Sequence, residues 1–548
     1  MTGGYDERGP HSERTAIRAR RDRATRAGAV LDDGAAALAG GVSGGAAPAG
    51  GVTGGAALER AVRAVLGALA GGAARRAGPI PAGSPGELAA QVAAALTPAP
   101  ALDGRHGRTG ERDDDLGGFA ELGRLAGLLA YGSADPADPA CAAHLHCPPL
   151  AVAVAADLAV SALNPSLDSW DQAPAATEME KLLVTELAEL AGYPAGAAGV
   201  VTSGGTESNL MGLMLARDHV LGAATGLPIQ LSGLSATGPR PRIFASAAAH
   251  FSVRRAAALL GLGEDAVVRV PVDRELRMLP DGLAAALRDS SARRSERPIA
   301  VVATAGATDT GAIDPLETCA RLAAEHGAWL HVDAAYGGGA LLSDRLAPLV
   351  AGIELADSLS LDWHKLGWQP AAAGVFLVRR AETYQSLARR AAYLNPEDDE
   401  EAGYTSLLGR SLRTTRRADA FKIAVTLRTL GRDGLGRLVD ACHDLAREAA
   451  AAVRAHPRLE LHADPVLTAL LFRYLPADPA RADQVNARLR RRLLREGRAV
   501  VGRTELPGEG PGRIRLKLTL LNPYTTGEEV ERLLHAVAAA GRAEEEAL

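Results

Sequence analysis

The sequence predicts an α/β fold built on a mainly parallel, seven-stranded sheet with helices on both faces. Seven short apolar runs lie between residues 198 and 378, and amphipathic helical patterns separate several of them. The runs are apolar along their length, as in strands that are buried on both faces. Helical and strand patterns continue after residue 411, which predicts a smaller C-terminal α/β domain.

The elements follow in a regular order along the chain. The strand candidates are AGVVTS (198–203), RIFAS (242–246), AVVRVPV (266–272), PIAVVATAG (298–306), AWLHVDAA (328–335), SLSLD (358–362) and GVFLV (374–378). Helical patterns fill 207–220, 253–263, 281–289 and 315–327. Near the C-terminus, 459–475 and 513–521 read as strands and 526–541 as the last helix. This alternation is typical of parallel sheets with crossover helices.

Composition divides the chain into four predicted segments. Residues 1–85 are of low complexity, rich in Ala, Gly and Arg, and we expect them to be disordered apart from one short helix at LERAVRAVLGALA. Residues 86–165 form an N-terminal helical segment, 166–410 the large domain and 411–548 the small domain. No repeat of fixed period is visible.

Charge and cysteine content exclude several classes of protein. The 548 residues carry a net charge of −5, so no basic surface for nucleic acid is expected. No apolar run is long enough for a membrane span, and no secretory or organellar leader is recognisable. The four cysteines are widely spaced, which is typical of a reducing compartment. We therefore expect a cytoplasmic protein.

Two motifs in the predicted large domain place polar groups at strand ends. In TSGGTESN, Gly204 and Gly205 allow close approach of a ligand, and Thr206 offers a hydroxyl near a helix start. Such a start can bind phosphate, although a strand-to-helix turn in any α/β protein also favours glycine. In WLHVDAAYGGG, Asp333 ends an apolar strand, either as a cap or as the partner of a cation.

A third motif, SLDWHKLGW, places Lys365 between two tryptophans after the strand candidate 358–362. Burying an ammonium there is unfavourable unless it is paired or used chemically. Lys365 and Asp333 end neighbouring strand candidates, at the edge where open α/β sheets bind ligands. The two residues form either a bare salt bridge or, beside a phosphate cradle, a site for pyridoxal 5′-phosphate.

The chemistry of pyridoxal 5′-phosphate needs these residue types. A lysine amine bonds covalently to the aldehyde, and a carboxylate keeps the ring nitrogen protonated so that the ring accepts electrons. His250, in ASAAAHFSV, either stacks on the ring or is a structural loop histidine. No metal is expected, because HLHCPP groups only three soft ligands and lacks a fourth.

Together and in this order, TSGGTESN, HVDAAYGG and SLDWHKLGW resemble the pyridoxal-phosphate-dependent group II decarboxylases. The resemblance covers about residues 120–530. It implies the fold type I of pyridoxal-phosphate-dependent transferases, with 166–410 as the cofactor domain. It also implies a carboxy-lyase of amino acid metabolism that acts as a homodimer, with its site at the subunit interface.

The resemblance assigns catalytic roles position by position. Lys365 matches the Schiff-base lysine, and His364 matches the histidine that precedes it in the family. Asp333 matches the partner of the ring nitrogen, and Ala335 matches the small residue packed near the ring. His250 matches the histidine that stacks on the cofactor.

Further positions match the cofactor-binding residues of the family. Gly205 and Thr206 match the phosphate cradle, and Thr308 in ATAGATDTGAIDP matches a threonine near the cofactor. The chain departs from the aromatic-type members at Asp362, where they commonly carry Asn. The acidic loop near Tyr404 lies where the family has a mobile catalytic loop, but its sequence differs from theirs.

Four other stretches are similar to the diaminobutyrate and lysine decarboxylase branch: HLHCPP, SALNPSLDSWDQAPAATEMEK, GRSLRTTRRADAFK and LKLTLLNPYTT. We therefore expect a small-molecule diamino acid substrate, such as 2,4-diaminobutyrate, lysine or ornithine. Asp168 or Asp171, beside Trp170, could pair with the distal ammonium. Alternatively, these carboxylates cap a helix or bind Lys181.

Three alternatives remain open at this point. The substrate could be an aromatic or acidic amino acid. The same scaffold also supports transamination and carbon–sulfur cleavage, although Cys442 lies in a helical pattern, which is unsuitable for a reactive cysteine. A non-catalytic binding module is a different class of hypothesis, and the presence of Lys365, Asp333 and His250 argues against it.

Overall fold

The computed structural model describes residues 55–97, 119–235, 238–388, 391, 393–506 and 512–548. The chain divides into two units, Met1–Ala61 and Val62–Leu548. In the first unit only residues 55–61 are described, and they form the start of helix α2 (Gly55–Arg76). Both sheets and the candidate site lie in the second unit.

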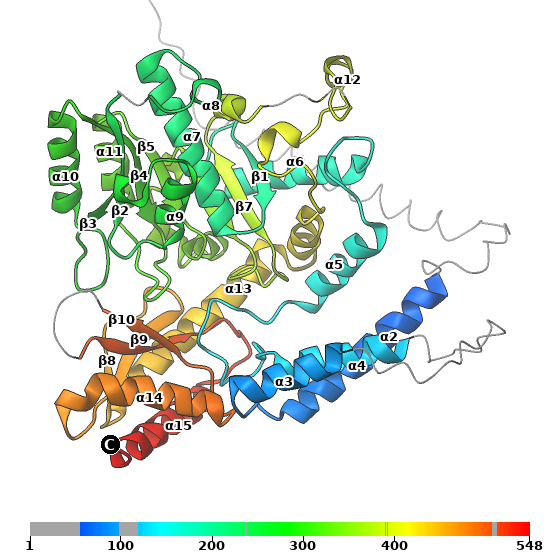
Figure 1. Cartoon of the computed structure of the whole chain (residues 1–548), viewed down its shortest axis with the longest axis vertical. Helices are drawn as coiled ribbons and strands as arrows, with labels where there is room; N and C mark the ends of the chain where they lie inside the picture. The colour runs from blue at the N-terminus through cyan, green and yellow to red at the C-terminus, as the bar shows by residue number, and fades with distance from the viewer. Residues whose placement is uncertain (1–54, 98–118, 236–237, 389–390, 392, 507–511) are drawn as a thin grey trace, which may run out of the picture. The chain divides into compact units, whose positions relative to one another are not determined.

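Seven strands form the central sheet in the order β1-β7-β6-β5-β4-β2-β3 (Figure 1). The strands are β1 (Ala198–Thr202), β2 (Arg240–Ser246), β3 (Val267–Val270), β4 (Glu296–Thr304), β5 (Trp329–Asp333), β6 (Ser358–Asp362) and β7 (Gly374–Val378). Neighbours from β6 to β3 pair in parallel, whereas β7 is antiparallel to both β1 and β6. The predicted mainly parallel, seven-stranded sheet is confirmed, and each strand candidate overlaps one observed strand.

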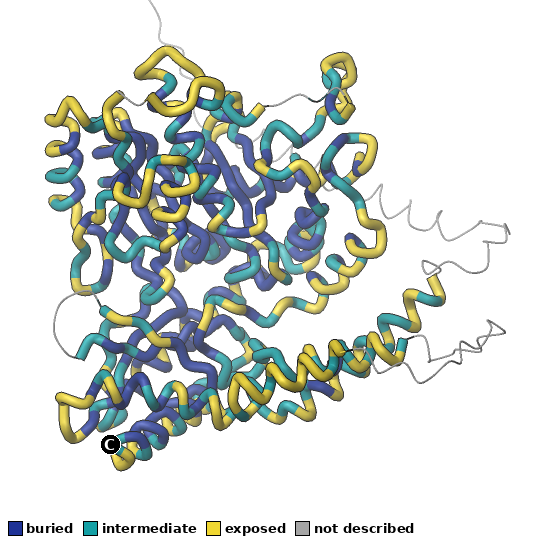
Figure 2. Tube along the Cα trace, in the orientation of Figure 1, coloured by how far each residue is buried: buried dark blue, intermediate teal, exposed yellow. Residues whose placement is uncertain are grey.

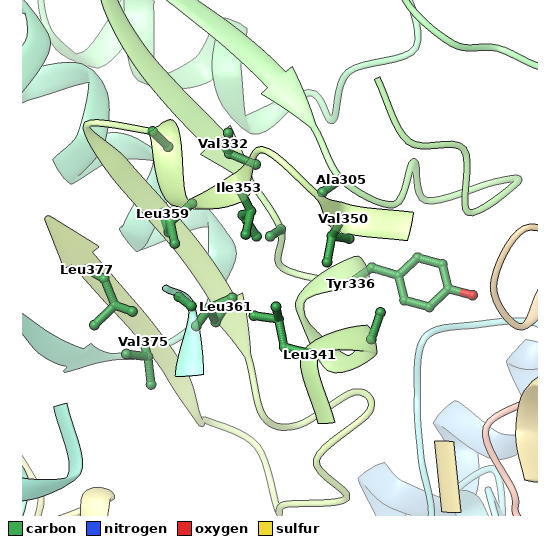
Figure 3. Packing of buried hydrophobic residues seen from close by; sticks show 14 of the residues in the cluster. Ala305, Val332, Tyr336, Leu341, Val350, Ile353, Leu359, Leu361, Val375 and Leu377 are labelled. Carbon is green, nitrogen blue, oxygen red and sulfur yellow. The ribbon is translucent and has the colours of Figure 1, made fainter. Parts of the chain in front are cut away.

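Successive residues of a central strand face two different hydrophobic clusters. On β7, Val375 and Leu377 belong to one cluster, while Phe376 and Val378 belong to the other. Figure 3 shows Val375 and Leu377 near Leu361 of β6. The strands lie in the most deeply buried part of the chain (Figure 2). Their continuous apolar character therefore follows from burial on both faces.

Helices cover both faces of this sheet. The first cluster receives side chains from α6 (Pro174–Leu190), α10 (Pro280–Ala292), α11 (Leu316–Glu325) and α13 (Ala420–Ala455), and the second from α7 (Gly205–Thr225) and α9 (Ser252–Leu259). The other short helices are α3 (Pro85–Leu96), α4 (Ala120–Gly132), α5 (Ala151–Leu163), α8 (Ile229–Ser232) and α12 (Glu397–Glu401). None of the described helices is both long enough and apolar enough to cross a membrane.

The C-terminal region forms a four-stranded antiparallel sheet in the order β10-β11-β9-β8. Its strands are β8 (Leu459–Leu461), β9 (Ala469–Tyr474), β10 (Gly502–Glu505) and β11 (Ile514–Thr519). Its apolar residues share a cluster with α13, α14 (Ala482–Arg495) and α15 (Gly527–Glu546). This is the smaller α/β region that the sequence predicts, with β10 as an additional strand.

The N-terminal part agrees with the sequence prediction only in part, because α2 is longer than the predicted short helix and residues 55–85, otherwise expected to be disordered, are described. The predicted short helix at LERAVRAVLGALA lies within α2, which is 22 residues long. Residues 1–54 of the predicted low-complexity segment lie outside the described residues. The predicted domain boundaries at residues 85, 165 and 410 stay predictions.

Candidate active site

A cavity of about 370 Å³ lies at the carboxyl ends of β5 and β6. These two strands are parallel neighbours, and Asp333 at the end of β5 pairs in register with Ser360 of β6. Ligand sites of open α/β sheets lie at this edge. The cavity is lined by all eight residues that the sequence analysis predicts for the site, namely Gly205, Thr206, His250, Thr308, Asp333, Ala335, His364 and Lys365. The predicted residues are therefore brought together.

A tight connection between two antiparallel strands holds Lys365. Trp363 N–H donates to the carbonyl of Ala373 (2.7 Å), which continues the β6–β7 pairing beyond the strand ends. Trp363 and Trp368 are buried, and a Cβ on Gly367 would lie 2.6 Å from the Trp363 ring. The tryptophans thus pack the loop against the core, while the lysine points into the cavity.

The amine of Lys365 has a carboxylate partner in Asp362. Lys365 Nζ lies 2.8 Å from Asp362 Oδ2, and 18% of the lysine side chain is exposed. His364 Nε2 lies 3.6 Å from the same oxygen, and His364 Nδ1 accepts a hydrogen bond from Ala373 N–H (3.3 Å). Burial lowers the pKa of His364. His364 is therefore a neutral ring beside the ion pair.

Glycines form the part of the cavity wall next to His364 and Asp362. Gly204, with φ +148°, precedes α7, and no described side chain caps this helix. A Cβ on Gly204 would lie 3.1 Å from His364 Cε1, and one on Gly205 would lie 2.9 Å from Ala335 Cβ. The free backbone N–H groups of this first turn, together with the Thr206 hydroxyl, are suited to an anion such as phosphate.

Asp333 is fixed by two hydrogen bonds inside the sheet. Its Oδ2 accepts from Asn209 Nδ2 (2.7 Å) and its Oδ1 from Ala335 N–H (3.2 Å). Donors of this kind favour the ionised carboxylate. Asn209 lies in the motif TSGGTESN but was not predicted as a site residue. It lies about one helical turn after Gly205, and its contact with Asp333 depends on how α7 packs on the sheet, for which the sequence has no local signal.

His250 lies on the loop between β2 and α9. Its Nδ1 contacts the Ser252 hydroxyl at 2.8 Å, and its ring centroid lies 4.2 Å from that of Phe251. Burial is the main cause that lowers the pKa of His250, and Lys365 lowers it further, against an opposing effect of Asp333. A neutral imidazole at the cavity wall can stack on a flat ring.

Thr308 lines the cavity and also contacts the C-terminal sheet. The carbonyl of Thr308 accepts from Lys517 Nζ (3.4 Å), and the same amine pairs with Asp309 (3.0 Å). Lys517 belongs to β11, and its side chain is buried. This contact was not predicted, because it depends on the docking of two sheets that are far apart in sequence.

The predicted substrate carboxylates do not line the cavity. Asp168 accepts from Ser166 Oγ and Thr415 Oγ1, and Asp171 accepts from Ser169 Oγ. Tyr404 packs on Trp170, with ring centroids 5.1 Å apart. The suggested salt bridge to Lys181 is wrong for the described chain, in which Lys181 pairs with Glu178 (2.8 Å).

The HLHCPP stretch contributes packing at the site. Leu145 lines the cavity, and the Cys147 thiol donates to the carbonyl of His364 (3.3 Å). Burial raises the pKa of Cys147 to about 12, so the thiol stays protonated. Among the described residues no group of three or more His, Cys, Asp or Glu is arranged to hold a metal ion.

Two buried oxygens at the cavity test whether a polar ligand fits. Asp362 Oδ1 and Thr304 Oγ1 have no hydrogen-bond partner within the described part of the chain, and both residues line the cavity. Buried polar atoms are normally satisfied. The unpaired Thr304 hydroxyl, together with a helix start without a side-chain cap, a lysine and the buried Asp333 carboxylate, fits a ligand with a phosphate, an aldehyde and a ring nitrogen, whereas the unpaired oxygen of Asp362 calls for a donor.

Comparisons with known proteins agree with this chemistry. A family model described as "Pyridoxal-dependent decarboxylase conserved domain" matches residues 122–475. The L-2,4-diaminobutyrate decarboxylase of Rhizobium meliloti (strain 1021) is 44% identical over 427 residues, which cover 77% of this chain and 81% of the relative. The protein of the same name from Acinetobacter baumannii is 38% identical over 78% of this chain and 84% of the relative.

A solved structure shows the same fold. It is the glutamate decarboxylase domain of diaminobutyrate-pyruvate transaminase and L-2,4-diaminobutyrate decarboxylase from Vibrio parahaemolyticus. It matches with a TM-score of 0.76 and 32% identity, and the match covers 90% of this chain and 97% of the other. The similarity therefore extends over most of the chain.

Proposed function

The chain belongs to the family of pyridoxal-dependent decarboxylases, and from this membership we propose that it removes the α-carboxylate of L-2,4-diaminobutyrate, giving propane-1,3-diamine and carbon dioxide. It is a carboxy-lyase, and pyridoxal 5′-phosphate is its cofactor. One observation supports the proposed site above all others: the amine of Lys365 and the carboxylate of Asp333 line one cavity at the ends of neighbouring parallel strands.

We propose that different cavity residues bind different parts of the cofactor. Gly205 and Thr206, at the start of α7, would hold the phosphate, and Lys365 would bond to the aldehyde carbon. Asp333 would face the ring nitrogen. His250 would stack on the ring. The remaining lining positions that we assign to cofactor binding are Thr308, Ala335 and His364. When bound, the cofactor supplies an acceptor for the electron pair that the departing carboxylate leaves behind.

The chain's own residues would control protons and orientation. Asp333, held in place by its two hydrogen bonds, would keep a proton on the ring nitrogen. Lys365 must lose a proton before its Nζ acts as a nucleophile, and the cavity wall carries the Asp362 carboxylate to take part in that transfer. His250 would restrict the ring to one plane, so that the bond to the carboxylate is the one aligned for cleavage.

The substrate assignment rests on the two diaminobutyrate decarboxylases that cover about four fifths of this chain. The test incubates the purified protein and added cofactor with separate L-amino acids: 2,4-diaminobutyrate, ornithine, lysine, glutamate and an aromatic one. Mass spectrometry should detect propane-1,3-diamine from the first as the fastest product. An aromatic amine or γ-aminobutyrate without any diamine would overturn the assignment.

The covalent role of Lys365 has its own test. Borohydride reduction of the loaded protein, followed by peptide mapping, should leave the cofactor attached to the peptide that contains Lys365. A label on another lysine, or no label at all, would refute the proposed site whatever the substrate is.

We also propose that the chain forms a homodimer. Helices α5 and α6 expose large apolar side chains, namely Val154, Leu158, Leu163, Met179 and Leu182. Exposed apolar patches typically mark interfaces, and symmetric dimers are the commonest soluble assemblies. Light scattering should give twice the chain mass of 56.4 kDa, and Leu182→Glu should shift it toward the monomer. A monomeric wild type would contradict the proposal.

We propose a cytoplasmic location on the basis of thiol chemistry. All four cysteines are free, which is typical of a reducing compartment. Cell fractionation should recover the activity with cytoplasmic markers, and recovery with an exported fraction would contradict this.

A further inference from the structure

The carboxylate of Asp333 is the end of a chain of buried hydrogen bonds that runs through the sheet. Trp329 Nε1 donates to Ser358 Oγ (2.8 Å), which contacts His331 Nδ1 (2.8 Å). His331 Nε2 contacts Asn209 Oδ1 (2.9 Å), and Asn209 Nδ2 donates to Asp333 Oδ2 (2.7 Å). The five residues come from β5, β6 and α7. No gap in this sequence of contacts exceeds a normal hydrogen bond.

The chemistry of the two ends fixes the direction of every hydrogen in this chain. An indole N–H can only donate and an ionised carboxylate can only accept. Because the Asn209 amino group donates to Asp333, Asn209 Oδ1 faces His331 and can only accept, so His331 carries its proton on Nε2 and donates there. A neutral His331 then accepts at Nδ1, so Ser358 Oγ, which accepts from Trp329, gives its own hydrogen to His331. All donors point toward the carboxylate.

A second branch leaves Asn209 toward the cavity wall. The amino group of Asn209 also donates to Ser252 Oγ (2.9 Å). Since Ser252 Oγ accepts there, its hydroxyl hydrogen is available for His250 Nδ1 (2.8 Å), which also accepts from Ser252 N–H (3.3 Å). His250 Nδ1 is thus an acceptor, and a neutral His250 carries its proton on Nε2.

The residues of this network are almost completely buried, which restricts how their protons can be arranged. Asn209, Ser252, His331, Ser358 and Ser360 are each at most 1% exposed, and Asn209 Oδ1 receives a further hydrogen bond from Ser360 Oγ (2.6 Å). With water excluded, a wrongly directed hydrogen leaves a buried group unsatisfied, which is costly. The network therefore selects one arrangement of protons.

We propose that Asn209 is a positioning residue and the branch point of this donor chain, which orients the Asp333 carboxylate and fixes the proton of His250 on Nε2. Only the catalytic role of Asp333 and His250 in this proposal rests on the proposed function. An ionised Asp333 keeps the cofactor ring nitrogen protonated, and a fixed His250 presents an N–H edge toward the cavity.

Asn209→Asp tests the branch, because it replaces the amino group by an acceptor. The Ser252 hydroxyl should then donate to the new carboxylate instead of to His250, which leaves His250 Nδ1 with only the longer hydrogen bond from Ser252 N–H (3.3 Å), so the fraction of His250 that carries its proton on Nδ1 should rise. Nitrogen NMR of histidine-labelled, cofactor-free protein reads the tautomer directly, with His250→Gln used for assignment. Asn209→Ala, which removes both amide hydrogens without adding a charge, should give a mixture of the two tautomers.

Activity and spectra supply the second readout. In the loaded enzyme, Asn209→Ala should lower kcat by about 10- to 100-fold, the size typical for partners that orient site residues, with KM changed less than threefold. The pH at which the visible absorbance of the bound cofactor changes should shift as well. A merely structural role would move neither this pH nor the His250 tautomer.

The matched control is Asn486→Asp. Asn486 is another fully buried asparagine, and it bonds Tyr474 N–H and the carbonyls of Tyr474 and Ala482 in the C-terminal region. It should destabilise the protein yet leave the His250 tautomer unchanged. A wild-type tautomer in both Asn209 variants, with an unshifted absorbance profile, would overturn the proposal. Because the NMR uses cofactor-free protein, that result stands apart from the borohydride test of the proposed function.

Discussion

Two enclosed lysines, Lys365 and Lys422, have contrasting surroundings. Lys422, in the first turn of α13, is 0% exposed and lies between two carboxylates, Asp157 (3.0 Å) and Asp419 (3.1 Å). Lys365 lies 2.8 Å from Asp362, which is its carboxylate partner within the described chain, and its side chain is 18% exposed to the cavity. The Lys422 ammonium is thus enclosed by two carboxylates, whereas the Lys365 ammonium borders the cavity.

The surroundings of Lys422 are a balanced cluster of charges. Arg417 also pairs with both Asp157 (2.7 Å) and Asp419 (2.9 Å), so two cations face two anions. Burial raises the pKa of Asp157, but hydrogen bonds from Arg417 and Lys422 outweigh it and lower the pKa below its usual value. Such a cluster anchors α5 to the start of α13, whereas the weaker pairing at Lys365 leaves its nitrogen available for chemistry. The number of partners thus separates a structural lysine from a reactive one.

The largest effect should come from Lys365→Ala. Removing the amine eliminates both covalent attachment and proton transfer, so decarboxylation should fall by about 10³-fold or more. Thermal unfolding of the cofactor-free variant should occur at a lower temperature than in the wild type, because the Asp362 side chain, which is 3% exposed, loses its cation. Activity retained within tenfold would show that the contrast between the two lysines is wrong.

Lys422→Met should lower the stability of the protein and leave the covalent chemistry at Lys365 intact. It leaves Asp157 and Asp419 with one cation, and breaking a buried charge cluster costs about 3 kcal/mol or more. Urea unfolding of the cofactor-free protein measures this loss. Borohydride labelling at Lys365 should persist in the folded variant, and Lys422→Met combined with Asp419→Asn should recover part of the stability. No loss of stability would show that the cluster is dispensable.

His331 extends the comparison to a buried base whose hydrogen-bond partners are neutral. Burial lowers its pKa to about 4, below the ordinary value of about 6.5 in the unfolded chain. The unfolded chain therefore binds more protons between these values, so the stability is complete above pH 6.5 and is lost as the pH falls. From pH 7 to 5 the wild type should lose about 2 kcal/mol more than His331→Gln, as measured by urea unfolding. Equal losses would contradict this.

The smallest effect should come from Asp362→Asn. Asp362 Oδ2 would lie 3.3 Å from a Cβ on Gly205, so its charge lies beside the proposed phosphate cradle. Removing it should tighten the binding of inorganic phosphate to the cofactor-free protein by about tenfold, because like charges at this range repel. Calorimetry measures the affinity, and Asp344→Asn at the exposed surface should leave it unchanged. Weaker phosphate binding would place the anion elsewhere.

The sequence predicts those site residues whose positions follow from the ends of strands and the starts of helices. Lys365, Asp333 and Gly205 each lie at a strand end or helix start, and parallel pairing brings such ends to one edge. Asn209 was missed because its partner Asp333 lies 124 residues away, and a helix pattern does not reveal which strand a polar residue meets.

Other errors have similar physical causes. The strand β10, with the sequence GRTE, lacks an apolar pattern and is held by its pairing with β11. The suggested ion pair of Lys181 with Asp168 or Asp171 failed because hydroxyl groups satisfy these carboxylates locally. Polar contacts between distant segments depend on tertiary docking, which spacing in the sequence does not encode.

The antiparallel course of β7 has a consequence for motion. Its pairing with β6 from Ser358↔Val378 to Asp362↔Gly374 closes the loop of Lys365 like the end of a hairpin, and β7 is bonded on its other side to β1. Freeing the lysine backbone would require breaking the pairing of β6 and β7, two strands that have a neighbour on each side, and such buried strands are among the last regions of a protein to open. Amide protons at Trp363 and Leu377 should accordingly exchange with solvent far more slowly than those of the acidic segment 397–403. Lys365, the proposed nucleophile, thus lies at a rigid part of the sheet. The movements of a catalytic cycle must therefore occur in the segments around it.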